Sequence, residues 1–269
     1  MTARIPSILE RALSLLSIRL VLQQLALALI VFALYALWLH VPDANFLDVI
    51  ATALLAILTL AVAGTGESAL ILHLSGQARN PWKLLRGTLL LLAGAVPWLG
   101  WNALLAHFRG DDFTRAAGYV NSRFPHVLRY FFTFDHILRW IGWAWSILQW
   151  IGTAVIAAFI IPSFAAVRPL AAIVSTLRSV AWWIAALLGP ITATFLTATL
   201  MQWTPGHGLR VEMLSLILRL SAAVLIDTAI LCFLLAIVAA RIRQSDALYT
   251  TPAGIPDPDD NQLRTAGNP

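Results

Sequence analysis

An aspartate inside a long apolar segment is the residue of this sequence that most strongly suggests chemistry. Asp227 lies near the centre of the apolar run 213–240, where an ionised carboxylate in lipid is costly unless it is paired. A carboxyl group at that depth can carry a proton, bind an ion or form a buried pair. The structural alternative is a protonated carboxyl that hydrogen-bonds to a neighbouring helix through Thr192, Thr194 or Thr197.

Two further charged residues belong to this candidate intramembrane polar site. Arg219 precedes Asp227 by eight residues, which separates them by about 12 Å along a helix and roughly 80° around it. We therefore expect no direct ion pair, and expect Arg219 to extend its charge to the outer interface. Glu67 lies in the segment GTGES, residues 64–68, whose glycines permit close backbone approach or local unwinding. Glu67 either lines a cavity with Asp227 or lies at a solvated helix end.

Two apolar runs carry candidate helix breaks. Gly94 and Pro97 interrupt the run 84–107, and Gly189 and Pro190 interrupt the run 180–202. Broken membrane helices often mark binding sites in transporters, but they also occur in ordinary bundles, where neighbouring groups satisfy the freed backbone atoms. A polar cavity shared by Asp227 and Glu67 and bounded by these prolines would favour transport. A dry, packed interior would favour a structural role.

Enzymatic motifs offer no competing interpretation. The sequence contains no HExxH, GxSxG, GxxxxGK or CxxC pattern, and it identifies no cofactor. The single cysteine, Cys232, cannot form an intrachain disulfide or a cysteine-based metal cage. The histidines lack metal-ligand spacing, so no metal site is predicted. These absences do not favour an enzyme.

Composition places these residues in a membrane. Hydrophobic residues make up 59% of the 269 residues and charged residues only 12%, against about 25% charged in soluble domains. Each of the main apolar runs can cross a hydrocarbon core of about 30 Å, and their unbroken apolarity excludes the alternation of barrel strands. We predict an all-α polytopic bundle of about six transmembrane helices, at 20–41, 48–73, 84–107, 138–161, 180–202 and 213–240.

The segments outside the spans have distinct patterns. Residues 4–19 are amphipathic and form either a separate interfacial helix or an extension of the first span. The connection 108–136 mixes arginine with many aromatic residues, which favours an interfacial helix or lid on the outer face. From residue 244 onward the chain is polar and rich in proline, so we predict a membrane domain at 1–243 and a disordered cytoplasmic tail at 244–269.

Basic residues predict the orientation. With a cytoplasmic N-terminus, eleven arginines and lysines fall on the inner side and seven on the outer side, five of these in the one long connection. This bias favours two cytoplasmic termini. The richness in arginine and the lack of targeting signals favour a plasma membrane of bacterial type. The basic residues are scattered singly despite a net charge of +5, so nucleic acid is not an expected partner.

The sequence leaves two classes of function. The leading hypothesis is a non-catalytic membrane subunit, scaffold or assembly factor, because few charged residues lie inside the spans. Its partners would be the lipid bilayer and another membrane protein or a second copy of the chain. The alternative is a small-solute or proton-coupled transporter that uses Asp227 and Glu67.

Overall fold

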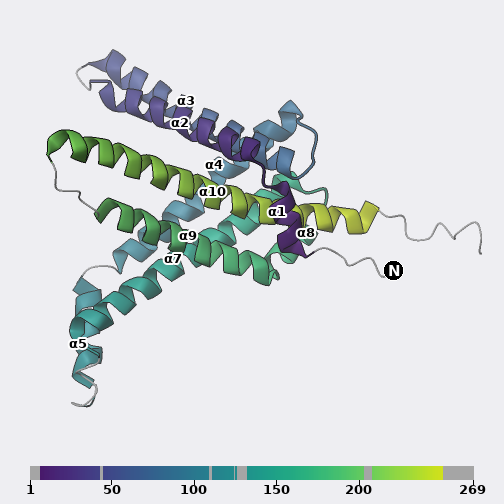
Figure 1. Ribbon diagram of the computed structural model, residues 1–269. Helices are drawn as coiled ribbons and strands as arrows, with labels where there is room; N and C mark the ends of the chain where they lie inside the picture. The colour runs from purple at the N-terminus through teal and green to yellow at the C-terminus, as the bar shows by residue number, and fades with distance from the viewer. Residues whose placement is uncertain are drawn as a thin grey trace, which may run out of the picture.

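The architecture is that of a helical bundle throughout the described part of the chain. The computed structural model describes residues 7–42, 45–108, 111–123, 125, 132–202 and 208–250, and these ranges contain helices and no strand. The helices (Figure 1) are α1 Ile8–Leu15, α2 Ile18–His40, α3 Phe46–Leu74, α4 Pro81–His107, α5 Asp111–Arg123, α7 Phe134–Ala165, α8 Pro169–Leu177, α9 Val180–Gln202 and α10 Leu209–Thr250.

Six of these helices confirm the predicted membrane bundle. Helices α2, α3, α4, α7, α9 and α10 are long and apolar enough to cross a bilayer. The structure differs from the sequence prediction at the end of the last helix. Helix α10 continues to Thr250, whereas the sequence predicts that the membrane domain ends at residue 243. The predicted tail therefore begins as helix, and residues 251–269 lie outside the described ranges.

The amphipathic N-terminal segment is a helix separate from the first span. Ser7 and Glu10 form a reciprocal capping box at the start of α1, which satisfies two backbone N–H groups that have no partner within the helix. Helix α1 ends before Leu16, and Ser17 caps α2 with its side chain. Since Ala12 is fully buried and α1 packs against α10, α1 is part of the fold and does not extend the first span.

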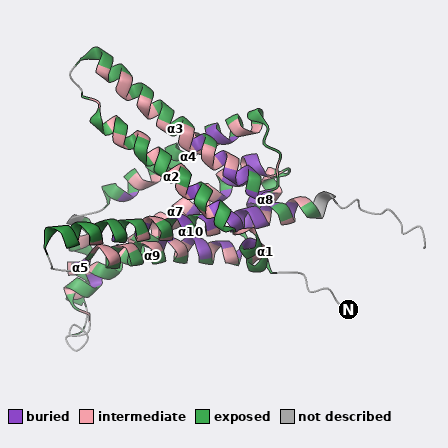
Figure 2. Ribbon diagram, turned by 45° about the horizontal axis from the view of Figure 1, so that its top comes forward, coloured by how far each residue is buried: buried purple, intermediate pink, exposed green. Residues whose placement is uncertain are grey.

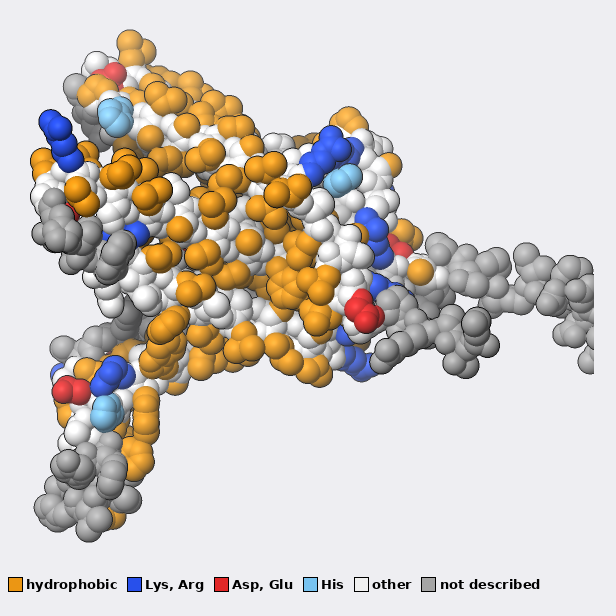
Figure 3. All heavy atoms as spheres, in the orientation of Figure 1, with side chains coloured by type: hydrophobic (Ala, Val, Ile, Leu, Met, Phe, Trp, Pro, Cys, Tyr) orange, Lys and Arg blue, Asp and Glu red, His pale blue; other side chains and the backbone are white. Residues whose placement is uncertain are grey.

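The bundle has a closed end and an open end. The closed end contains α1, α8 and the C-terminal half of α10, where most buried residues gather (Figure 2). Toward the open end, the pairs α2–α3, α4–α7 and α9–α10 diverge from one another (Figure 1). None of the residues in the most apolar 18-residue window of α3 is buried. Apolar side chains accordingly cover the diverging pairs (Figure 3).

Polar side chains of α10 join the helix pairs at the closed end. Arg241 donates to the Ser179 hydroxyl from Nε at 3.0 Å and from Nη2 at 2.7 Å. Arg243 Nε donates to the carbonyl oxygen of Leu74 at 2.8 Å, in the last turn of α3, where carbonyls lack intrahelical partners. Asp246 accepts from the backbone N–H of Val167 at 3.2 Å. These bonds explain why α10 stays helical beyond residue 243.

Small residues allow close helix contacts near the same end. A Cβ atom added at Gly87 of α4 would lie 2.8 Å from Ser68 Oγ of α3 and 2.9 Å from Phe164 Cδ2 of α7. Helices in lipid associate mainly through such close packing, because burial from lipid brings little hydrophobic gain. Gly87 therefore fixes the contact among three helices.

Candidate functional site

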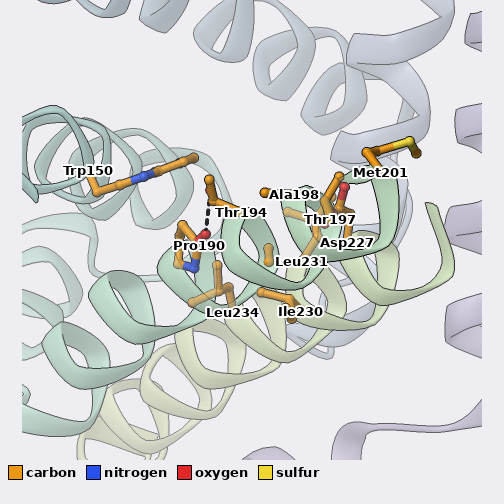
Figure 4. Close-up of a pocket in the computed structure, with 11 residues that line it drawn as sticks. Trp150, Pro190, Thr194, Thr197, Ala198, Met201, Asp227, Ile230, Leu231 and Leu234 are labelled. Atoms are coloured by element: carbon orange, nitrogen blue, oxygen red, sulfur yellow. Dashed lines mark hydrogen bonds between the residues drawn. The ribbon is translucent and has the colours of Figure 1, made fainter. Parts of the chain in front are cut away.

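Asp227 lies in a groove between α7, α9 and α10. The groove has a volume of about 540 Å³, and Figure 4 shows Asp227 beside Thr197 at one end and Trp150 at the other. Its lining is mainly apolar and consists of Trp150, Pro190, Ala193, Thr194, Thr197, Ala198, Met201, Asp227, Ile230, Leu231 and Leu234. The groove thus combines one carboxyl group with an apolar wall.

The Asp227 carboxyl has no protein partner within the described ranges. Its side chain is exposed, and none of the described hydrogen bonds or ion pairs involves it. The threonines that the sequence suggested as partners are placed differently. The Thr194 hydroxyl donates to the Pro190 carbonyl at 2.8 Å (Figure 4), Thr192 lines a different groove, and the buried Thr197 hydroxyl has no partner among the described residues.

The glycine–proline pair of α9 forms part of this groove without dividing the helix. Helix α9 runs from Val180 to Gln202 through Pro190. A Cβ atom at Gly189 would lie 3.1 Å from Ile230 Cγ2 of α10, so Gly189 is a contact point between α9 and α10. Helix α4 likewise continues through Pro97. The sequence suggested a break at each proline, but both helices are continuous there.

Glu67 belongs to a second polar site, between α2, α3 and α10. It is half-buried and accepts a hydrogen bond from Nε2 of Gln24, whose side chain is only 3% exposed. The fully buried Cys232 of α10 lies close enough to interact electrostatically with Glu67. Helix α3 continues through Glu67 to Leu74, so Glu67 is held within a helix contact and not at a helix end.

The glycines around Glu67 serve close packing. A Cβ atom at Gly66 would overlap Leu27 Cδ1 of α2, and one at Gly64 would lie 2.8 Å from Thr88 Cγ2 of α4. The segment GTGES suggested either close backbone approach or local unwinding. The structure shows close approach, because α3 is continuous there. Gly66 brings α2 near enough for Gln24 to reach Glu67.

Arg219 joins α10 to the end of α9. It is 8% exposed, and its Nη1 donates to the carbonyl oxygens of Leu200 and Met201 at 3.3 and 3.4 Å. These carbonyls belong to the last turn of α9, where a cation offsets the partial negative charge of the helix end. Among the described contacts, none joins Arg219 to Asp227, and the absence of a direct pair stays a prediction of the eight-residue spacing.

The structure does not bring the predicted polar residues into one cavity. Asp227 lines the groove between α7, α9 and α10, whereas Glu67 bonds to Gln24 of α2. The two acids therefore belong to different helix contacts. Pro190 lines the Asp227 groove, but Glu67 and Pro97 do not. Gly94 instead packs against α7, where an added Cβ would lie 2.8 Å from Ile160 Cδ1.

Polar pairs that the sequence reasoning missed join neighbouring helices. Asn102 of α4 accepts from Gln149 of α7 at 2.6 Å, and Trp98 donates to the Thr153 hydroxyl at 3.2 Å. Gln24 was missed as well. Isolated amides inside apolar runs are the signal that could have identified these residues, because lipid provides no hydrogen-bond partner for them.

The described ranges contain no group of three histidine, cysteine or carboxylate side chains that could hold a metal ion. Comparison with known proteins gave no match, since no family model, curated protein or solved structure is similar to the chain.

Proposed function

We propose that this protein is a non-catalytic membrane subunit, scaffold or assembly factor. The observation that carries the proposal is that the helices pack together at the closed end, whereas three helix pairs diverge toward the open end (Figure 1). Large apolar side chains stay exposed on the diverging pairs, among them Leu54 of α3 and Ile217 of α10. Because helices in lipid gain stability from close packing, another protein or a second copy would cover the faces that one chain leaves exposed.

The use of intramembrane polar groups supports the same proposal. Gln24 with Glu67, Asn102 with Gln149, and Arg219 with the end of α9 all connect neighbouring helices. A solute pathway needs polar groups that face a common cavity. Here these groups hold helices together, as expected for a structural component.

Photo-crosslinking in native membranes tests this proposal. A photoreactive amino acid would replace Leu54, which is 62% exposed on the open half of α3, or as a control Leu170, which is 79% exposed on α8 at the closed end. We expect a discrete protein adduct at Leu54, identified by mass spectrometry as one partner or a second copy, and only lipid adducts at Leu170. Lipid adducts alone at both positions would contradict a subunit role for the open half.

Transport of a small solute is a second candidate, favoured by the exposed Asp227 carboxyl in its groove. Proton or solute flux would be measured in proteoliposomes with wild-type protein and folded Asp227→Asn. Flux that this substitution abolishes would make Asp227 a transport residue and replace the scaffold proposal. Absence of flux from both proteins, across a broad panel of solutes, would support the subunit role.

The proposed location is a plasma membrane with both termini on the cytoplasmic side. The first and last described residues lie at the same end of the bundle (Figure 1), as six crossings require. The excess of basic residues on the termini and on the connections of that end supports a cytoplasmic assignment for the closed end.

A further inference from the structure

We propose that the Asp227 groove binds a lipophilic organic cation, with the cationic centre near Asp227 and the apolar substituents extending toward Trp150. This inference does not depend on the scaffold role, because a ligand can bind a structural subunit. If the chain transports a solute, the same inference names the class of that solute.

The charge of the groove argues for a cationic ligand. Asp227 is exposed to the groove and has no partner among the described residues. The cation nearest along α10, Arg219, donates to carbonyls of α9. A carboxylate in apolar surroundings is stabilised mainly by an opposite charge or by hydrogen bonds. A cationic centre beside Asp227 would provide that charge.

The lining argues for an organic cation and against a metal ion. Calcium takes six to eight oxygen ligands, and magnesium requires nearly ideal octahedral geometry. The groove offers the carboxyl group of Asp227, while the Thr197 hydroxyl is buried and the Thr194 hydroxyl donates to the Pro190 carbonyl. The remaining side chains are almost all apolar, so they suit hydrocarbon or aromatic substituents around a cationic centre.

The size of the groove favours a small molecule over a partner helix. Its volume of about 540 Å³ falls within the range of about 300–1,000 Å³ typical of small-molecule sites. A transmembrane helix of about 20 residues, with a diameter of about 10 Å and a rise of 1.5 Å per residue, occupies roughly 2,400 Å³. The groove would hold only a small part of such a helix.

Trp150 gives the ligand an orientation. It comes from α7 and lies at the opposite end of the groove from Asp227 (Figure 4). Aromatic rings favour contact with other aromatic or apolar groups, and also with cations. A ligand with its charge at Asp227 would therefore place an apolar or aromatic substituent against Trp150.

Binding of tetraphenylphosphonium to the full-length protein in lipid nanodiscs tests the proposal. Tetraphenylborate, which has nearly the same shape and the opposite charge, is the matched probe, and empty nanodiscs correct for partition into lipid. We expect wild-type protein to bind the cation and not the anion. Asp227→Asn should weaken cation binding by at least about 10-fold, because it removes one member of a charge pair, and Asp227→Glu should retain binding.

Glu67→Gln is the control variant, since it removes another acid of the apolar helices, one that lies on α3 and bonds to Gln24 of α2. It should bind the cation as wild-type protein does, and Trp150→Ala should weaken binding without reversing the charge preference. The proposal is overturned by any of three results: wild-type binding no greater than that of empty nanodiscs, equal binding by Asp227→Asn, or an equal loss in Glu67→Gln. Because Leu54 crosslinking does not involve this groove, failure here leaves the subunit proposal separately testable.

Discussion

The two halves of α10 have similar apolarity but very different surroundings. In the closed half, Leu235, Ile237 and Ile242 are buried, whereas in the open half Leu214, Ile217 and Leu218 are exposed. One helix therefore passes from a packed interior to a surface that only lipid or a partner can cover. Hydropathy therefore identifies a membrane helix but does not determine how much of it the same chain buries.

The difference between the halves follows from side-chain size and from hydrogen bonds to neighbouring helices. The closed half contains the segment LAIVAA, residues 235–240, whose alanines let neighbouring helices approach closely. The open half contains MLSLILRL, residues 213–220, in which bulky side chains keep neighbours apart. Arg241 and Arg243 then join the closed half to adjacent helices.

The largest predicted effect compares one substitution in the two halves of α10. Ile242→Ala should lower the free energy of unfolding by about 2 kcal/mol or more, because Ile242 is 0% exposed and its truncation leaves a cavity. Ile217→Ala should change it by less than about 1 kcal/mol, because Ile217 is 58% exposed. Denaturant unfolding in mixed micelles measures both variants.

Reconstitution with lipid or with a partner sharpens this test. If a partner covers the open half, Ile217→Ala should weaken the complex while it leaves the isolated chain almost unchanged. Equal destabilisation of the isolated chain by Ile217→Ala and Ile242→Ala would show that the open half is packed in the monomer, and the contrast between the halves would fail.

A smaller effect separates two glycines of α4. Gly87→Ala should lower the free energy of unfolding by about 1–3 kcal/mol, because the added methyl would contact Ser68 and Phe164 at under 3 Å. Gly100, toward the open end, has no atom within 4 Å of an added Cβ, so Gly100→Ala should stabilise the helix by up to about 1 kcal/mol. Thermal unfolding of both variants checks the sign of each change, and destabilisation by both would contradict an open space at Gly100.

Sequence reasoning predicted the spans better than the site for a physical reason. A run of about 20 apolar residues has few alternatives to a membrane helix, so the six helices followed from length and composition. The separation of Arg219 from Asp227 also followed, because both residues lie on one helix of known geometry. The pairing of Glu67 with Gln24 did not, because it depends on how α2 and α3 rotate and approach.

The C-terminal part of α10 shows the same limit. Polar residues after 243 predicted the loss of helix, yet Asp246 accepts from the backbone of Val167, and Ser245 is buried. A polar segment can remain helical where distant parts of the chain provide partners. That information lies in the tertiary contacts and not in the local pattern.

The smallest predicted effect tests whether the polar pair at Glu67 holds α2 against α3. Gln24→Leu removes the donor to Glu67 and should lower the free energy of unfolding by about 1 kcal/mol, the scale of interhelical hydrogen bonds in lipid. Gln23→Leu is the control, because the adjacent Gln23 side chain is exposed and none of the described contacts depends on it. Unfolding in mixed micelles should therefore separate two neighbouring glutamines. If Gln24→Leu were as stable as Gln23→Leu, the bond to Glu67 would contribute nothing to the stability of this contact. A structural role for Glu67 would then lose its support.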